Sequence, residues 1–215
     1  MSDLNTQLLS AASNGDHLSV EKLVKQGADI NYIDQWGNFA MFSAAWEGNI
    51  KAMDKYHELG ANLSFEDANL LCNAAYNGKP GAVKWLLEKG ADADFVFAKT
   101  GENALHYTIS KMSEMEDRAE IVKVLIAAGT NVHKKTIAKA ETLCFMRDAY
   151  LKGETPLHRA AAYGSTQIIT SLLDAGADPA TKDANGDTPI SWASWHLRDS
   201  DVLRLLVYEG VARVH

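Results

Sequence analysis

Residues 153–164 read Gly-Glu-Thr-Pro-Leu-His-Arg-Ala-Ala-Ala-Tyr-Gly, and residues 172–178 read Leu-Leu-Asp-Ala-Gly-Ala-Asp. Thr155 can cap a helix with its hydroxyl, and Pro156 fits the first helical position, where no amide hydrogen bond is lost. Ala160 and Ala161 have no bulk, so a neighbouring helix can pack close to them. Gly164 can adopt the positive φ that ends one helix before a second, antiparallel one. The stretch predicts two helices joined by a tight turn.

The second of these helices has a clear apolar face, formed by Ile168, Ile169, Leu172 and Leu173 at helical spacing, and Gly176 ends it. The Thr-Pro-Leu-His phrase, the paired alanines and the late Gly-Ala-Asp together resemble the ankyrin repeat. The resemblance implies helix-turn-helix units joined by short β-hairpin turns.

The late glycine recurs, which allows the units to be counted. Successive copies lie 33, 30, 39, 47 and 34 residues apart, at Gly27, Gly60, Gly90, Gly129, Gly176 and Gly210. A period near 33 residues is that of the ankyrin repeat. We therefore expect one all-α ankyrin-repeat domain over residues 1–215, a solenoid capped at both ends. Its six units are predicted at residues 4–33, 34–66, 67–97, 98–133, 152–182 and 183–211.

Two insertions interrupt the period. About five extra residues, 112–116, separate the helices of the fourth unit, and a longer segment precedes the fifth. From Thr136 to Lys152 apolar residues favour one side and no Gly or Pro occurs, so an added amphipathic helix is predicted at about 134–151. Insertions in repeat arrays often lie on the binding face. This helix is equally consistent with shielding the stack.

Composition excludes several classes of partner. The net charge is −7, from 21 basic and 28 acidic residues, which disfavours nucleic acid and anionic membrane. No stretch approaches the ~20 apolar residues of a membrane helix. The first residues lack the pattern of a secretory signal. Cys72 and Cys144 are predicted to be reduced, in a cytoplasmic protein.

No set of residues predicts catalysis. His106 and His158 occupy the same slot of the repeat, where the resemblance implies a structural hydrogen bond to the hairpin backbone. The remaining histidines have no metal-binding spacing, and the glycines lie at helix ends instead of in a phosphate loop. We therefore expect no enzymatic activity, no metal and no cofactor.

The remaining candidates for a function are residues on the surface. In the repeat family the hairpin tips and inner helices line a concave groove that contacts partners, and the matching positions here include several aromatic residues. Trp36 and Trp46 are expected to contact a partner, whereas Trp195 is expected to fill a gap and Trp85 and Trp192 to lie in the core. The candidate partner-binding residues are Gln35, Trp36, Asn38, Trp46, Glu47, Tyr76, Asn77, Lys99, Glu102, Lys111, Tyr163, Trp195 and His196.

Two functions stay open at this point. The first is a non-catalytic interaction protein, a regulator, inhibitor or immunity-type protein that is monomeric on its own and binds one partner protein in the groove. The acidic charge would suit a basic partner. The alternative is a regulatory or scaffold subunit of a larger enzyme assembly, which a hydrophobic face too large for a free monomer would favour.

Overall fold

The computed structural model describes residues 3–63, 69–110, 115–140 and 153–209. The chain divides into two compact units, Met1–Ala91 and Asp92–His215, and each is described by itself. The boundary falls inside the phrase Gly90-Ala91-Asp92, six residues before the predicted end of the third repeat at residue 97. The expectation of one domain over the whole chain stays a prediction.

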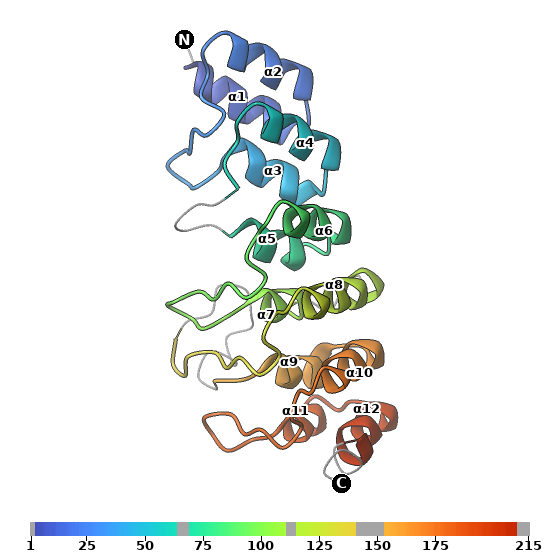
Figure 1. The fold of residues 1–215 in the computed structure, drawn as a ribbon. Helices are drawn as coiled ribbons and strands as arrows, with labels where there is room; N and C mark the ends of the chain where they lie inside the picture. Colours follow the sequence, from blue (N-terminus) through green and yellow to red (C-terminus); the bar gives the residue numbers. More distant parts are fainter. Residues whose placement is uncertain (1–2, 64–68, 111–114, 141–152, 210–215) are drawn as a thin grey trace. The chain divides into compact units, whose positions relative to one another are not determined.

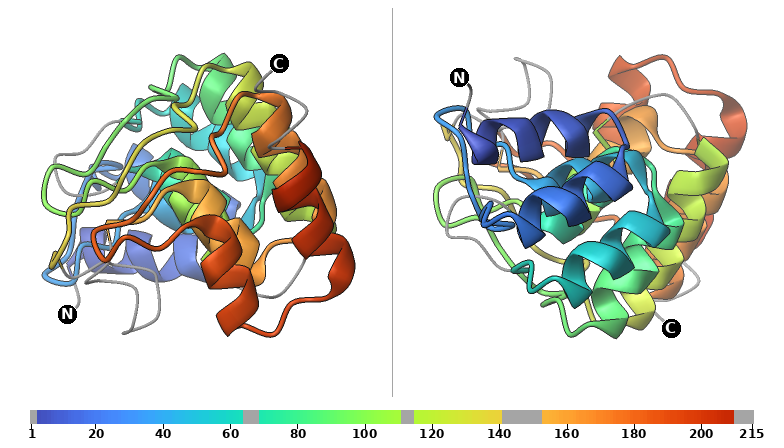
Figure 2. Two further views of the ribbon diagram at one scale, coloured as in Figure 1. Left: turned by 90° about the horizontal axis from the view of Figure 1, so that it is seen from below. Right: turned by 90° about the horizontal axis from the view of Figure 1, so that it is seen from above.

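The first unit holds three helix pairs. These are α1 (Leu4–Ser13) with α2 (His17–Lys25), α3 (Ala40–Glu47) with α4 (Ile50–Glu58), and α5 (Leu70–Tyr76) with α6 (Pro80–Glu88) (Figure 1). The first helices of successive pairs pack on one another, α1 on α3 and α3 on α5. Figure 2 shows α1 and α2 side by side and antiparallel, as the repeat pattern predicts.

The second unit repeats the arrangement. It contains α7 (Ala104–Thr108) with α8 (Met115–Ala127), α9 (Pro156–Tyr163) with α10 (Thr166–Asp174), and α11 (Pro189–Trp195) with α12 (Ser200–Arg204), which continues into a π-helical turn, Leu205–Glu209. Helix α9 packs against both α7 and α11, and α8 packs against α10. The all-α helix-pair architecture is confirmed.

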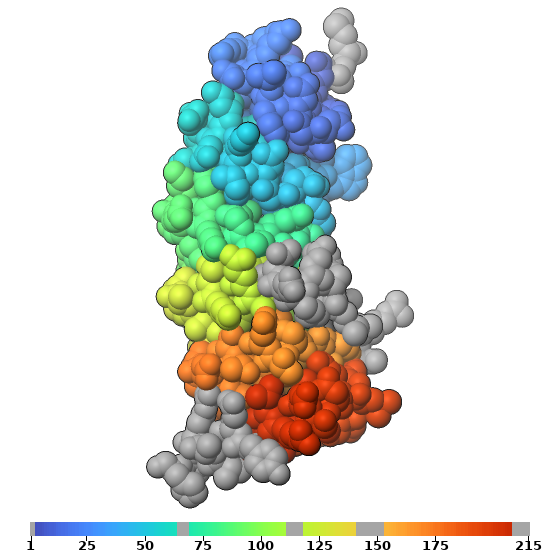
Figure 3. All heavy atoms as spheres, turned by 90° about the vertical axis from the view of Figure 1, so that its right-hand side faces the viewer, coloured from blue at the N-terminus to red at the C-terminus, as the bar shows by residue number. Residues whose placement is uncertain are grey.

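Small side chains explain the close stacking. We call the first helix of each pair the inner helix and the second the outer helix. The paired alanines of the inner helices are all buried: Ala44, Ala45, Ala74, Ala75, Ala160 and Ala161. Branched residues of the outer helices, such as Ile169 and Leu172, fill the layer behind them. Atoms of the successive pairs of the first unit accordingly form a continuous packed surface in Figure 3. Burial of this apolar area is the main stabilising term of the fold.

The loops before the inner helices form hydrogen-bonded turns and almost no β-ladder. The backbone N–H of Asp34 donates to the carbonyl of Asn38 at 3.1 Å, and that of Asp183 donates to Asp187 at 2.8 Å. In each turn the aspartate carboxylate also accepts two backbone N–H groups, an Asx turn. Within the described ranges, the β-structure is a single bridge, Val96 to Asn103.

Two positions require glycine for different physical reasons. Gly176 ends α10 with φ +89°, as predicted. Gly164 does not have the expected positive φ; its backbone is extended, with φ −73° and ψ 165°. A Cβ at Gly164 would lie 2.8 Å from the carbonyl oxygen of Ala160, so lack of space is what demands glycine there.

The long insertion does not begin as predicted. Residues 134–140 form extended and turn structure, so no helix begins at Thr136. The backbone N–H of Thr136 donates to the carbonyl of Glu154 at 2.9 Å, and that of Ile137 donates to Thr100 at 2.7 Å. These bonds join the segment to the residues that precede α7 and α9. Because the two N–H groups are used in this way, they are not available for hydrogen bonds within a helix. The rest of the predicted helix, and Cys144, lie outside the described residues. Cys72 is buried and forms no disulfide with a described residue.

Candidate functional site

Trp46 borders an open hollow on the first unit. The indole lies near the end of α3 and is 38% exposed. Gly48 ends this helix in the left-handed conformation, with φ 71°. The hollow has a volume of about 380 Å³. Its lining residues come from α1, α3 and the turn before α3: Ser13, Asn38, Phe42, Ser43, Trp46 and Glu47.

The rings of the inner helices form a row. Phe42 lies 5.6 Å from Trp46 and Trp46 lies 6.3 Å from Tyr76, measured between ring centroids. Such spacings are those of interacting aromatic pairs. Trp46 is thus held by neighbouring rings while one part of it remains exposed, which is the geometry of a preorganised contact. Trp36, at the turn before α3, is 76% exposed.

Charge is segregated in the first unit. Every lysine there lies on an outer helix or caps one, and residues 1–91 contain no arginine: the lysines are Lys22, Lys25, Lys51, Lys55, Lys79, Lys84 and Lys89. The inner helices and the described loops before them carry only carboxylates: Asp3, Asp29, Asp34 and Glu47. The loops of the second unit differ, since they carry Lys99, Lys134, Lys135, Lys139 and Lys182. The inner side of the first unit is therefore anionic.

The other candidate residues fall into three groups. Side chains exposed as expected are Gln35, Asn38, Glu47, Lys99 and His196, and Trp195 is exposed although it was expected to fill a gap. Tyr76, Asn77 and Tyr163 are half-buried. The amide of Asn77 donates to the carbonyl of Asn73 at 3.1 Å and so folds back on its own helix. Lys111 lies outside the described residues.

The prediction that Glu102 lies at an exposed hairpin tip is wrong, because its side chain is 0% exposed. Its carboxylate pairs with Arg159 at 2.8 Å, and Arg159 also pairs with Glu154 at 2.7 Å. The second carboxylate oxygen of Glu154 accepts from the hydroxyl of Thr136 at 2.7 Å. Because the pairs are buried, removal of one charge would leave the others without compensation. Glu102 is therefore a structural residue.

Sequence reasoning missed this cluster although a signal was present. Glu102 and Glu154 occupy the same slot of two repeats, each directly after a hairpin glycine. Arg159 stands on the inner helix between the histidine and the alanine pair. Two acids and one base in registered positions of adjacent repeats indicate an ion pair across the repeat boundary.

The two registered histidines have the predicted structural role. Nδ1 of His158 accepts from the backbone N–H of Thr155 at 3.2 Å, and Nε2 contacts the carbonyl of Asp187 in the next loop at 3.1 Å. His106 bonds the N–H of Asn103 in the same way, at 3.2 Å. Burial lowers the pKa of both rings, that of His106 well below its ordinary value with Arg159 nearby as a second cause. Both are therefore neutral at pH 7.

The aromatic residues of the last helix pair divide between core and surface. Trp192 is buried against Ala162, with Tyr163 packed beside them. Trp85 is likewise buried in the first unit, so both core assignments are confirmed. Tyr163 and His196 face each other, with ring centroids 4.6 Å apart. Trp195 is 55% exposed, so it fills no closed gap.

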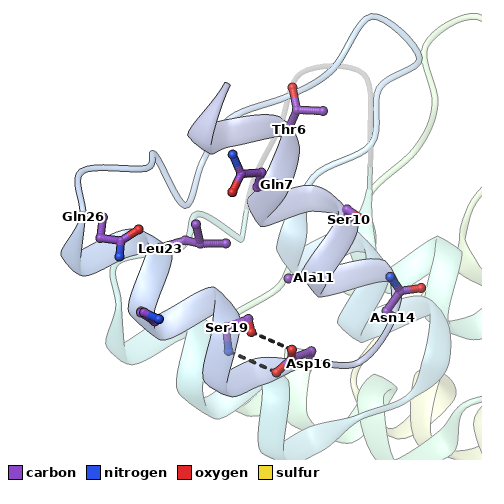
Figure 4. A pocket seen from close by; sticks show the side chains of 10 residues that line it. Thr6, Gln7, Ser10, Ala11, Asn14, Asp16, Ser19, Leu23 and Gln26 are labelled. Atoms are coloured by element: carbon purple, nitrogen blue, oxygen red, sulfur yellow. Dashed lines mark hydrogen bonds between the residues drawn. The ribbon is translucent and has the colours of Figure 1, made fainter. Parts of the chain in front are cut away.

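A larger hollow, of about 600 Å³, lies between α1 and α2 and has a different character. Figure 4 shows short polar side chains around it, among them Thr6, Gln7 and Asn14, and the hydrogen bonds from Ser19 to the carboxylate of Asp16. The described residues that line it include no aromatic ring. Among the residues that the structure describes, no group of three or more potential metal ligands occurs, and no helix has the length and apolarity to cross a bilayer.

Comparison with known proteins gives a consistent picture. The family model described as ankyrin repeats (3 copies) matches residues 41–136 and 135–214. The crystal structure of the human ASB11 ankyrin repeat domain superimposes with a TM-score of 0.76, covering 97% of this chain and 86% of that one at 21% identity. At that identity the likeness concerns the fold.

Curated relatives are similar along most of this chain. Chicken nuclear factor NF-kappa-B p105 subunit is 28% identical over 74% of it, and the mouse B-cell lymphoma 3 protein homolog is 27% identical over 86%. The aligned part is only 15% and 38% of the length of these two relatives. Protein PhlB of Serratia liquefaciens is 28% identical over 82% of this chain and 70% of its own length.

Proposed function

The chain belongs to the ankyrin-repeat family, and from this premise we propose that it binds a partner protein without catalysing a reaction. Repeat solenoids present extended surfaces for binding. The observation that carries the proposal is the exposure of two tryptophans, Trp36 and Trp46, on the inner side of one repeat of the first unit. Tryptophan is among the residues that most often dominate the energy of an interface.

The contacts of these two rings support the choice. Trp46 is oriented by Phe42 and Tyr76, so little side-chain entropy is lost when a partner covers its exposed part. Trp36 stands on an Asx turn whose backbone is fixed by the carboxylate of Asp34. Two exposed tryptophans in one repeat, each on a fixed backbone, favour a specific contact with a folded or extended protein segment.

The other features of the inner side favour a regulator, inhibitor or immunity-type protein with a basic partner. The anionic inner side of the first unit would attract such a partner and reject an acidic one. Most of the length of the p105 subunit and of the B-cell lymphoma 3 protein homolog lies outside the alignment, so neither supplies a partner for this chain.

The test is a comparison of single substitutions after the partner is identified by affinity capture from the native organism and mass spectrometry. We expect Trp36→Ala to leave the melting temperature unchanged and to weaken partner binding by about 2 kcal/mol or more, roughly 30-fold in Kd. Trp46→Ala should weaken binding equally, with some loss of stability from the broken ring contacts.

The matched control is Leu18→Ala, which removes an apolar side chain of α2 that is 82% exposed on the outer side. It should change neither stability nor affinity. If all three variants bind the partner like the wild type, the inner side of the first unit is not the interface.

A further inference from the structure

We propose that the hollow beside Trp46 receives an arginine side chain from an extended basic segment of the partner protein. The inference rests on the proposed function and adds the chemistry of the contact. It identifies the partner as one that presents a guanidinium group to α1 and α3.

The first support is the pairing of aromatic and anionic groups in the lining. Phe42 and Trp46 line the hollow with aromatic rings, and Glu47 adds a carboxylate to the lining. Within the described residues, the side chain of Glu47 has no hydrogen-bond or ion-pair partner. A neutral apolar group placed here would cover that carboxylate without compensating its charge, which is unfavourable.

The second support is that no cation of the first unit fills the site. Lys79 lies close to the end of α3, since its methylene groups are what a Cβ at Gly48 would meet. Its ammonium makes no ion pair with Glu47 in the part of the chain that the structure describes. All other lysines of the unit lie on the outer helices or cap one. A cation that pairs with Glu47 would therefore come from outside the unit.

The third support concerns which cation fits. A guanidinium group is planar, so it can stack on an indole while its edge donates two hydrogen bonds to a carboxylate. The hydroxyls of Ser13 and Ser43 line the same hollow and can accept further N–H groups. The first unit already holds a cation over an indole on its outer side, where Nζ of Lys89 lies 5.5 Å from the ring centroid of Trp85.

The probe for the test is the blocked peptide acetyl-Gly-Ser-Arg-Ser-Gly-amide, titrated into the full chain and followed by two-dimensional ¹H–¹⁵N NMR. The matched peptide carries citrulline, which is neutral and has the same shape. We expect shift changes at the indole N–H of Trp46 and the amides of Ser13 and Ser43. Affinity for the citrulline peptide should be about fivefold to tenfold lower, from the lost cation–π and ion-pair contributions.

Three variants locate the effect. Glu47→Gln should weaken binding of the arginine peptide by about twofold to fivefold, and Trp46→Ala should abolish it, whereas Trp46→Phe should restore it in part. Glu88→Gln is the control, because Glu88 is an exposed carboxylate at the end of an outer helix. A thermal melt of each variant checks that it is folded.

The outcomes separate this inference from the proposed function. Equal binding of the citrulline peptide, shift changes away from the hollow, or no effect of Glu47→Gln would overturn the arginine site. If the native partner nevertheless loses affinity with Trp36→Ala and Trp46→Ala, the interface stands and its contact is apolar. Self-association that shifts the same signals on concentration, without peptide, would assign the hollow to a second copy of the chain and overturn the inference.

Discussion

At the scale of single residues, the two registered histidines make the fold sensitive to acid. Burial lowers the pKa of His106 and His158 in the folded chain, whereas in the unfolded chain both have the ordinary value of 6.5. As pH falls through 6.5 the unfolded state therefore binds protons that the folded state does not. Stability from this source is complete above about pH 7 and decreases as pH falls below 6.5.

We expect acidification from pH 7.5 to pH 5 to lower the free energy of unfolding, with a larger contribution from His106, whose pKa is lowered further, than from His158. His158→Gln should lower stability at pH 7.5, since its bonds to the loops change, and should reduce the further loss at pH 5. His133→Gln, at an exposed position, is the control. Urea denaturation at the two pH values measures both quantities, and an unchanged pH dependence in His158→Gln would contradict the argument.

At the scale of elements, polar and small side chains decide how neighbouring helices meet. Arg159 on α9 donates to the carbonyl of His106 on α7 at 3.0 Å and pairs with the glutamates that precede both helices. The ion pair thus joins the fourth and fifth repeats, across the long insertion. Its removal should affect this boundary more than any surface charge.

Arg159→Met is predicted to cost about 3–5 kcal/mol of stability, because two buried carboxylates would then share a site without their cation. Arg204→Met, which breaks an exposed pair with Asp201, should cost less than about 1 kcal/mol. Chemical denaturation compares the two. A loss below about 1 kcal/mol in Arg159→Met would mean that the buried charges are not coupled.

The stacking of α9 on α11 gives a second prediction at this scale. Ala161 is 0% exposed, so Ala161→Leu should destabilise the chain by about 1–3 kcal/mol through overpacking. Ala127→Leu, at the exposed end of α8, should be neutral. The readout is the thermal midpoint of each variant. Identical midpoints would show that the inner helices are not aligned as described.

At the scale of the whole molecule, the two units differ in charge on their inner sides. The first is anionic there, and the second carries lysines in its loops. We therefore expect partner affinity to fall with rising salt and substitutions in the first unit to account for most of that dependence.

The chain alone is predicted to be a monomer. Light scattering coupled to size-exclusion chromatography should give the mass of one chain at all concentrations tested. A stable oligomer would instead favour the alternative of a regulatory or scaffold subunit, and would direct attention to exposed apolar residues such as Leu197 and Val207.

The sequence by itself determined the repeat architecture. Helix pairs, buried alanines, the helix-ending glycine at 176 and the structural histidines all follow from local rules that act within one repeat. Trp36 and Trp46 were also found in this way, because their exposure depends on their slot in the repeat. Local periodicity is sufficient where each unit contacts only its neighbours.

Only the tertiary structure decided the features that depart from the repeat pattern. Glu102 was expected at an exposed tip and is buried, because Arg159, 57 residues later, brings its charge to it. Gly164 is glycine for lack of space beside Ala160, and Thr136 begins no helix because its backbone bonds Glu154. The hollow beside Trp46 likewise needs Ser13 from another repeat. Each of these depends on contacts between segments far apart in sequence, which no local pattern encodes.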